Sequence, residues 1–244
     1  SVFRPDTEQN TIFPEADKTD RSPDVQNDCR ISIRPDPDLT GIMIDVPGDI
    51  SSAAYFLTAA SVVEGSEIVL RNVGINPTRS GILQILQDMG ADIAVENVRC
   101  GAEPAADLVV RAACLHGTEI GGEIIPALID EIPVLAVAAA AAEGTTVIRD
   151  AAELKVKESD RIDLITRGLK AMGADVEATD DGMIIHGGKP LHGALIETQN
   201  DHRIAMSFAV ASLIAEGDVI LSDASCTAIA YPGFFGDLAG LQSL

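Results

Sequence analysis

The sequence of 244 residues predicts an α/β (α+β) fold of repeated βαβαββ units, of which the third is incomplete. Three alanine-rich segments each begin at an aspartate, end at Glu-Gly and lead into a β-branched run. A second helical pattern ends in Met-Gly-Ala-Asp at residues 89–92 and again at 172–175. Such self-similarity indicates repeats. We place them at about residues 39–118, 119–196 and 197–244, and the last lacks its closing strands.

The helices of each repeat are marked by capping residues. Asp49, Asp130 and Asp201 are each expected to cap an alanine-rich helix, and the glycine of each Glu-Gly suits a C-cap. Second helices are expected from residue 81 to 89 and from 162 to 172. Strands are expected at residues 68–70, 145–148 and 219–221, at 93–96, 108–111, 176–178 and 183–186, and at 42–46, 123–125 and 194–197.

Residues 1–38 differ from the rest of the chain. They contain five prolines, many aspartates and little periodicity, which favours an extended or partly disordered arm. A short strand at residues 29–33 is compatible with their alternation. The predicted organisation is therefore an arm, 1–38, followed by one repetitive lobe, 39–244.

Composition excludes several kinds of partner and location. The net charge of −21 argues against binding to nucleic acid or to an anionic membrane. The four cysteines form no CxxC pair, so reduced thiols in a cytoplasmic protein are expected. The sequence lacks an apolar run of transmembrane length and a visible signal peptide. It also lacks the GxGxxG, P-loop and GxSxG motifs and any histidine spacing for a metal, so we expect no cofactor and no metal.

The most polar stretch, residues 153–162, is the first candidate site. If a helix begins at Ser159 or earlier, Lys157 and Arg161 lie one turn apart on one face, with Glu158 three residues before Arg161. Two cations and a carboxylate at a helix start could hold an anionic substrate and move a proton beside it. The alternative is a solvated helix start with local ion pairs.

Two further candidates stand near helix starts. Asp130 heads the second alanine-rich helix, where a capping role alone would explain it. Arg203 lies in the first turn of the third, where a cation opposes the helix dipole unless it faces an anion. Arg71 and Arg79 read as solvated surface residues. Helix N-termini gathered at one end of the repeats would form an anion-attracting surface.

Four motifs in order carry a resemblance that runs from about residue 40 to the C-terminus. They are Asp-Val-Pro-Gly-Asp-Ile-Ser-Ser-Ala at 45–53, Asn-Pro-Thr-Arg at 76–79, Leu-Lys-Val-Lys-Glu-Ser-Asp-Arg-Ile at 154–162 and Asn-Asp-His-Arg-Ile-Ala-Met at 200–206. The chain resembles the 5-enolpyruvylshikimate-3-phosphate (EPSP) synthase family, and the second motif resembles its glyphosate-tolerant bacterial branch. The resemblance implies two lobes of three βαβαββ units, of which this chain looks like the C-terminal one. It also implies that the family's N-terminal strand completes the third unit.

The resemblance also implies roles for individual residues. Asp130 would take the proton from the 5-hydroxyl of shikimate-3-phosphate, Lys157 would contact that hydroxyl and phosphoenolpyruvate, and Glu158 would protonate the enolpyruvyl methylene. Arg161 and Arg203 would bind the phosphoenolpyruvate anion. No metal or organic cofactor is implied. Both substrates and a complementing N-terminal lobe are the expected partners, because motifs of the other lobe are missing from this sequence.

One position departs from the family pattern, and two other readings stay open. Ile229 stands where many members carry a lysine. A UDP-N-acetylglucosamine enolpyruvyl transferase lobe would share the fold, although the Lys-Glu-Ser-Asp-Arg run favours the shikimate enzyme. The third reading is a non-catalytic module that keeps an anion pocket or serves in assembly.

Overall fold

The computed structural model describes residues 35, 38–41, 43–101 and 103–242. The chain divides into two units, Ser1–Met43 and Ile44–Leu244. Nearly all of the predicted arm, including the strand at residues 29–33, lies outside the described residues. The architecture below is that of the second unit.

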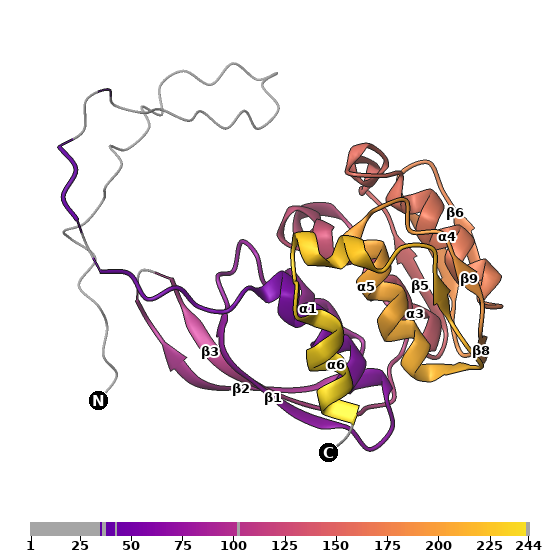
Figure 1. Ribbon diagram of the computed structural model, residues 1–244, viewed down its shortest axis with the longest axis horizontal. Helices are drawn as coiled ribbons and strands as arrows, with labels where there is room; N and C mark the ends of the chain where they lie inside the picture. The colour runs from indigo at the N-terminus through magenta and orange to yellow at the C-terminus, as the bar shows by residue number, and fades with distance from the viewer. Residues whose placement is uncertain (1–34, 36–37, 42, 102, 243–244) are drawn as a thin grey trace. The chain divides into compact units, whose positions relative to one another are not determined.

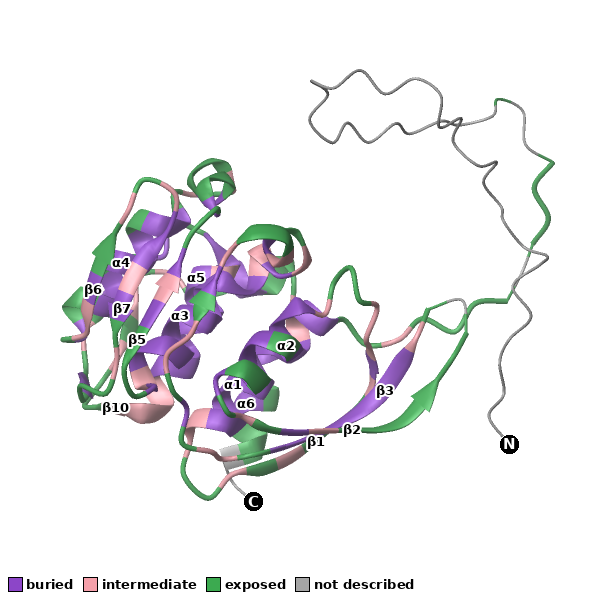
Figure 2. Cartoon of the chain, turned by 180° about the vertical axis from the view of Figure 1, so that it is seen from behind, coloured by how far each residue is buried: buried purple, intermediate pink, exposed green. Residues whose placement is uncertain are grey.

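Three alanine-rich helices form the centre of this unit. They are α1 (Ile50–Val62), α3 (Ile132–Ala141) and α5 (His202–Ala211), and each packs against the other two (Figure 1). All residues of α3 from 132 to 140 are buried, so this helix has no solvent face, and Figure 2 shows α3 and α5 largely in the buried colour. Small side chains let the helix backbones approach closely.

Sheets and second helices of the first two repeats surround this centre. In the first repeat, α2 (Gly81–Asp88) accompanies an antiparallel sheet of order β1-β3-β2. In the second, α4 (Arg161–Ala171) accompanies a sheet of order β4-β5-β7-β6. The strands are β1 (Glu67–Gly74), β2 (Asp92–Arg99), β3 (Ala105–Arg111), β4 (Glu119–Ile120), β5 (Thr145–Ile148), β6 (Asp175–Ala178) and β7 (Met183–His186). The second repeat therefore has the βαβαββ order that the sequence predicted, and the first has the same order without an opening strand among the described residues.

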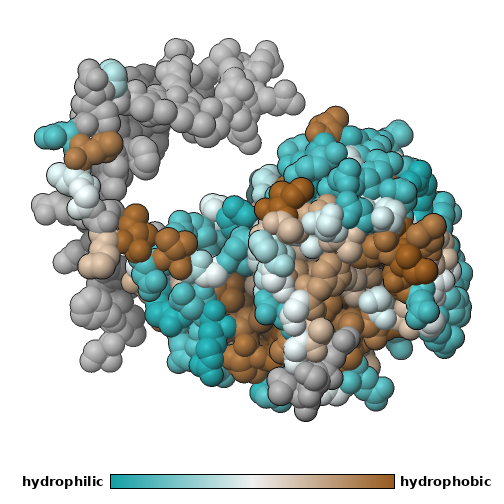
Figure 3. Space-filling view, viewed as in Figure 1, coloured by the Kyte–Doolittle hydropathy of each residue, from teal (hydrophilic) through white to brown (hydrophobic). Residues whose placement is uncertain are grey.

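The third repeat has no sheet of its own among the described residues. Its short strands β10 (Ala215–Glu216) and β11 (Ile220–Leu221) pair in parallel with β8 (Leu191–His192) and β9 (Leu195–Ile196) of the second repeat, and α6 (Phe234–Gln242) follows. Leu195 and Ile220 expose 69% and 59% of their surface, and a hydrophobic patch lies over this region in Figure 3. The missing closing strands agree with the sequence prediction for this repeat.

Two predicted strands are wrong, and two are shorter than expected. Residues 123–125 belong to a 3-10 segment, Gly122–Ala127, because Pro126 has no amide donor for a ladder and the strand β4 has already ended. Residues 43–46 form no strand; the only pairing nearby among the described residues is a single bridge from Gly48 to Val73. The strand expected at 194–197 is limited to β9, and the strand expected at 219–221 covers only β11, Ile220–Leu221.

Helix caps agree with the sequence in two of the three repeats. The carboxylate of Asp49 accepts from the amide of Ser52 at 2.9 Å, and that of Asp201 accepts from the amides of Arg203 and Ile204. Asp130 is not a cap: it lies in a 3-10 turn, Ile129–Glu131, and Glu131 precedes α3 without a side-chain bond. The side chain of Asp130 is therefore free for another role. Each Glu-Gly glycine has a positive φ, but it lies beyond the helix end, in the turn to the next strand.

Among the described residues, every helix is too short or too polar to span a bilayer. The described cysteines are Cys100, Cys114 and Cys226, and all three are free thiols.

The contact between α4 and α5 depends on the absence of a side chain at Gly168. A Cβ at Gly168 would clash with Cζ of Phe208, a ring that is almost fully buried. We expect Gly168→Ala to destabilise the fold by about 1–3 kcal/mol through overpacking, which outweighs the gain in helix propensity. The matched control is Gly236→Ala in α6, where a Cβ meets nothing within 4 Å. Urea unfolding should show the control to be neutral or more stable; equal stability of both variants would contradict the prediction.

Candidate functional site

The carboxylate of Asp130 is the meeting point of three cations. Its Oδ1 lies 3.2 Å from Nη1 of Arg161 and 3.8 Å from Nζ of Lys157, and its Oδ2 lies 3.4 Å from Nη2 of Arg203. The side chain is 34% exposed, so solvent reaches this group. The second repeat thus contributes Asp130 from the turn before α3, Lys157 from the loop before α4 and Arg161 from the start of α4, while the third contributes Arg203.

Arg161 is enclosed by carboxylates. Only 1% of its side chain is exposed, and its Nε donates to Oδ2 of Asp201 at 2.8 Å. Its Nη2 pairs with Glu158, as the spacing of three residues predicted. Helix α4 begins at Arg161 because the Asp160 carboxylate caps it by accepting from the amide of Asp163.

Asp201 is completely buried and has two tasks. It caps α5 and binds Arg161, and Oγ of Ser159 donates to it at 2.8 Å. Burial alone would raise the pKa of Asp201, but the hydrogen bonds and the charge of Arg161, with the Ser159 hydroxyl, hold that pKa below its ordinary value. Asp201 therefore stays ionised and fixes α4 against α5.

Lys157 reaches the site by a different route from the one predicted. It follows the 3-10 segment Ala152–Val156, outside helix α4, so it does not share a helix face with Arg161. Its Nζ lies 2.6 Å from Oε1 of Glu153 and 3.8 Å from Asp130. The side chain is 23% exposed, and Glu158 beside it is 53% exposed. Convergence on Asp130, and not helical spacing, brings these residues together.

Arg203 lies in the first turn of α5 and points toward the second repeat. Its Nη1 donates to the carbonyl oxygen of Asp130 at 3.3 Å and lies 3.7 Å from Oε1 of Glu131. Burial would lower the pKa of Arg203, but Tyr55, Asp130 and Glu131 raise it overall. The anionic surroundings offset the unfavourable helix dipole, and the guanidinium stays charged.

Five side chains expected from the sequence to share one site therefore do lie together: Asp130, Lys157, Glu158, Arg161 and Arg203. Residues that the sequence analysis did not assign to the site complete it, namely Asp201, Ser159, Glu153, Glu131 and Tyr55. The sequence did contain a feature that could have placed Asp201 in the site, since it precedes Arg203 by two residues and was predicted as a cap. Glu131 and Tyr55 had no such feature beyond a charged or aromatic side chain in an alanine-rich helical segment.

The other noted residues lie apart from this group or at its edge. Arg79 is 57% exposed and donates to Oγ of Ser51 at 3.2 Å, so it is not only a solvated residue. Ile229 is 73% exposed at the end of a 3-10 segment, Ser225–Ile229. The described residues contain no cluster of potential metal ligands.

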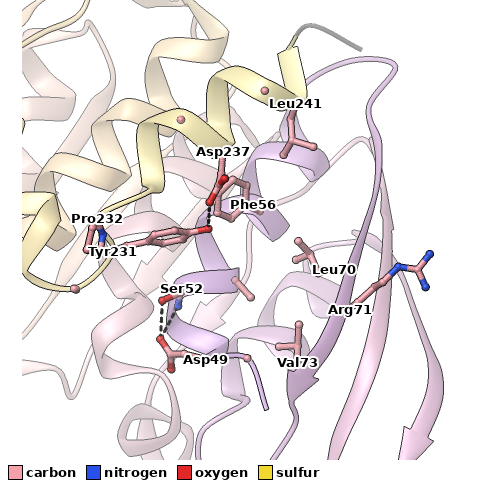
Figure 4. Close-up of a pocket in the computed structure, with 15 residues that line it drawn as sticks. Asp49, Ser52, Phe56, Leu70, Arg71, Val73, Tyr231, Pro232, Asp237 and Leu241 are labelled. Atoms are coloured by element: carbon pink, nitrogen blue, oxygen red, sulfur yellow. Dashed lines mark hydrogen bonds between the residues drawn. The ribbon is translucent and has the colours of Figure 1, made fainter. Parts of the chain in front are cut away.

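A separate hollow of about 570 Å³ lies between α1, β1 and α6. In Figure 4 the Tyr231 hydroxyl points to Asp237, 2.7 Å away, and Arg71 points outward. Burial, followed by the hydrogen bond to Asp237 and its charge, raises the pKa of Tyr231 to about 12. The lining is mostly apolar and contains none of the five predicted residues. We therefore place the candidate site at the charged group around Asp130 and not in this hollow.

Comparison with known proteins identifies relatives across most of the chain. A family model described as EPSP synthase (3-phosphoshikimate 1-carboxyvinyltransferase) matches residues 23–238. The 3-phosphoshikimate 1-carboxyvinyltransferase of Synechococcus sp. (strain RCC307) is 56% identical over 86% of this chain and 48% of that protein. The enzyme of the same name from Geobacillus kaustophilus (strain HTA426) is 55% identical over 83% of this chain and 48% of its own length. The chain thus spans about half the length of the curated relatives it matches.

Solved structures give the same picture. An EPSP synthase structure from Acinetobacter baumannii aligns with a TM-score of 0.77 at 48% identity, covering 80% of this chain and 46% of that one. The enolpyruvyl transferase NikO from Streptomyces tendae aligns with a TM-score of 0.58 at 19% identity, covering 79% and 42%. The second match concerns the fold alone. The family model, the relatives that are more than 50% identical and the Acinetobacter baumannii structure show that the chain belongs to the EPSP synthase family.

Proposed function

We propose that this chain forms one wall of a 3-phosphoshikimate 1-carboxyvinyltransferase active site. The reaction transfers the enolpyruvyl group of phosphoenolpyruvate to the 5-hydroxyl of shikimate-3-phosphate. The observation that carries the proposal is the convergence of Lys157, Arg161 and Arg203 on the Asp130 carboxylate. Membership of the family and the names of its relatives support it.

The chain corresponds, in this proposal, to the C-terminal lobe, and an N-terminal lobe supplies the opposite wall. The match to about half of each relative supports this division. The stretch at residues 76–79 favours the glyphosate-tolerant branch. We also propose a cytoplasmic location, with the two phosphorylated substrates as ligands and without nucleic acid or membrane partners.

The two groups proposed to act on the 5-hydroxyl are both accessible to solvent. The partly exposed Asp130 accepts the proton from the 5-hydroxyl, and Lys157 contacts that hydroxyl and phosphoenolpyruvate. As the hydroxyl oxygen bonds to C2 of phosphoenolpyruvate, Glu158 donates a proton to the C3 methylene. Transfer of one proton of the resulting methyl group back to the Glu158 carboxylate, with departure of phosphate from C2 of the tetrahedral adduct, then restores the double bond.

The two arginines balance the substrate's negative charge. Arg203 is 15% exposed and can offer its Nη2 to the carboxylate or phosphate of phosphoenolpyruvate. Arg161 is enclosed, so direct contact with the anion requires Glu158 to release it. Release of Glu158 would also free its carboxyl group for proton transfer. The cations thus bind the anion and stabilise charge that develops in the transition state.

Complementation tests the proposal. We expect the lone chain to release phosphate from phosphoenolpyruvate and shikimate-3-phosphate at least about 10³-fold more slowly than a mixture with a relative's N-terminal lobe, because half of the positioning groups are missing. Phosphate release is measured for the chain, for the lobe and for both together. Full activity of the lone chain would contradict the half-site claim. If the two lobes are shown to bind each other and the mixture still releases no phosphate, the enzymatic function would be contradicted.

A further inference from the structure

Glu131 is a buried carboxylate on the inner side of the site, and the proposed chemistry does not use it. The residue is 4% exposed, and its Oε1 has no hydrogen-bond partner among the described residues. Its nearest cation is Nη1 of Arg203, at 3.7 Å, which is too long for a hydrogen bond. Burial of an incompletely satisfied carboxylate is unfavourable for folding, so Glu131 must be held there by its surroundings.

Two polar side chains of the first repeat, Ser51 and Arg79, lie on the other side of this carboxylate. Ser51, in the first turn of α1, is almost completely buried and lies beside Glu131, where its hydroxyl opposes the rise in the pKa of that carboxyl. Nη2 of Arg79 donates to Oγ of Ser51 at 3.2 Å. Because the Ser51 oxygen accepts a hydrogen bond from Arg79, the Ser51 hydroxyl proton is available for the Glu131 carboxylate.

Arg203 has one anchored edge and one edge that faces the site. Nη1 donates to the Asp130 carbonyl and faces Glu131, and the buried Tyr55 side chain lies beside the same guanidinium. Nη2 lies toward the carboxylate of Asp130, which is one-third exposed. The inner contacts therefore determine how the outer edge is presented.

We propose that Glu131 is a positioning residue, whose carboxylate fixes the inner edge of the Arg203 guanidinium so that the outer edge is presented to an anionic substrate. Arg79 and Ser51 hold Glu131 in place, and this links the first repeat to a site built from the second and third. The identity of the anion as phosphoenolpyruvate rests on the proposed function, whereas the positioning itself does not.

The positioning can be measured on the chain by itself. Side-chain ¹⁵N–¹H spectra report rotation of the arginine guanidinium, and the Arg203 signal is assigned by its loss in Arg203→Lys. We expect slow rotation in the wild type, rotation at least about tenfold faster in Glu131→Gln, and an intermediate rate in Ser51→Ala. Glu143→Gln, at an exposed glutamate just beyond the other end of α3, is the matched control. An unchanged Arg203 signal in Glu131→Gln would overturn the proposal.

Acid titration of the wild type repeats the test without a variant. The groups facing Glu131 are Ser51, Tyr55, Arg79, Asp130 and Arg203. Burial, then the Asp130 charge, raises the pKa of Glu131 against the opposing effects of Ser51 and Arg203. Stability of the wild type should therefore fall as pH rises from the ordinary carboxyl pKa through the raised one, and Glu131→Gln should lack this fall. Protonation should also speed rotation of Arg203; rotation that is independent of pH in this range would count against the proposal.

A kinetic measurement then separates this inference from the proposed function. In the complemented enzyme, we expect Glu131→Gln to raise KM for phosphoenolpyruvate about tenfold and to change kcat by less than about threefold. An unchanged KM beside faster rotation would reject phosphoenolpyruvate as the anion that Arg203 binds. A silent wild-type mixture would reject the proposed function, and the spectra would still decide the role of Glu131.

Discussion

Replacement of Arg161 by methionine is expected to destabilise the fold by about 3–5 kcal/mol, the cost of removing one partner from a buried ion pair. Asp201 is completely buried and has Arg161 as its ion-pair partner, so the variant leaves an uncompensated charge between α4 and α5. Glu158 and Asp130 also lose a partner, although they are partly exposed. Unfolding by urea at several pH values measures the effect.

The dependence on pH has a defined sign. In the wild type, the pKa of Asp201 is below its ordinary value, so its stabilising contribution is complete above that ordinary value and is lost as pH falls through the lowered one. Without Arg161, burial dominates and raises the pKa of Asp201, so acid relieves the penalty. The difference from the wild type should therefore be smaller at pH 5 than at pH 8.

Arg167→Met is the control for this comparison. Arg167 is on the same helix, and its ion pair with Asp163 at 3.4 Å is about half exposed on both sides. Such a pair contributes about 0–1 kcal/mol. Equal losses for the two variants would mean that burial of Arg161 does not determine its contribution. Arg161→Lys, which keeps the charge but not the guanidinium geometry, should be intermediate.

Asp130→Asn is expected to lower kcat of the complemented enzyme by about 10³-fold, within the range for loss of a general base. The fold should change little, because each cation keeps another carboxylate: Lys157 has Glu153, Arg161 has Asp201 and Arg203 has Glu131. Phosphate release and thermal unfolding are measured on the same samples. The effect is thus expected in the chemistry and not in the stability.

Asp163→Asn provides the matched control, because Asp163 is an aspartate in an exposed ion pair of the same repeat. It should keep nearly full activity. If Asp130→Asn kept more than about a tenth of the wild-type rate, Asp130 would not be the base, and a different acceptor for the hydroxyl proton would be required.

Local patterns made most of the strands and helices of the repeats predictable. Alternating and helical periodicities mark strands such as Thr145–Ile148 and helices such as Gly81–Asp88, where burial of one face agrees with local preference. Glu158 and Arg161 do pair at three residues' spacing, but Glu158 precedes the Asp160 cap, so helical periodicity is not the cause of this contact. The segment at residues 122–127 was misread because a short apolar run does not distinguish a strand from a 3-10 turn.

The sequence pattern could not predict the contacts between repeats. Arg161 meets Asp201 across 40 residues, and Arg203 meets the Asp130 carbonyl across 73. No periodicity encodes such distances, so the resemblance to a family, and not spacing, placed Asp130 and Arg203 in one site. Glu131 could not be distinguished in sequence from the partly exposed Asp130 beside it, because its burial depends on how α1 packs against α3.

The small side chains of α3 affect how closely Arg203 approaches Asp130 and Glu131. Since α1 and α5 both pack on it, its side-chain volume sets the spacing between helix axes. The pairs that join Arg203 to Asp130 and to Glu131 span 3.4 and 3.7 Å, so a widening of about one ångström would break them. A single leucine in place of Ala136 or Ala138 would therefore break these contacts of Arg203 without contacting the arginine itself. Enlarging the side chains of α3 is thus a way to weaken anion binding without changing any ionisable residue.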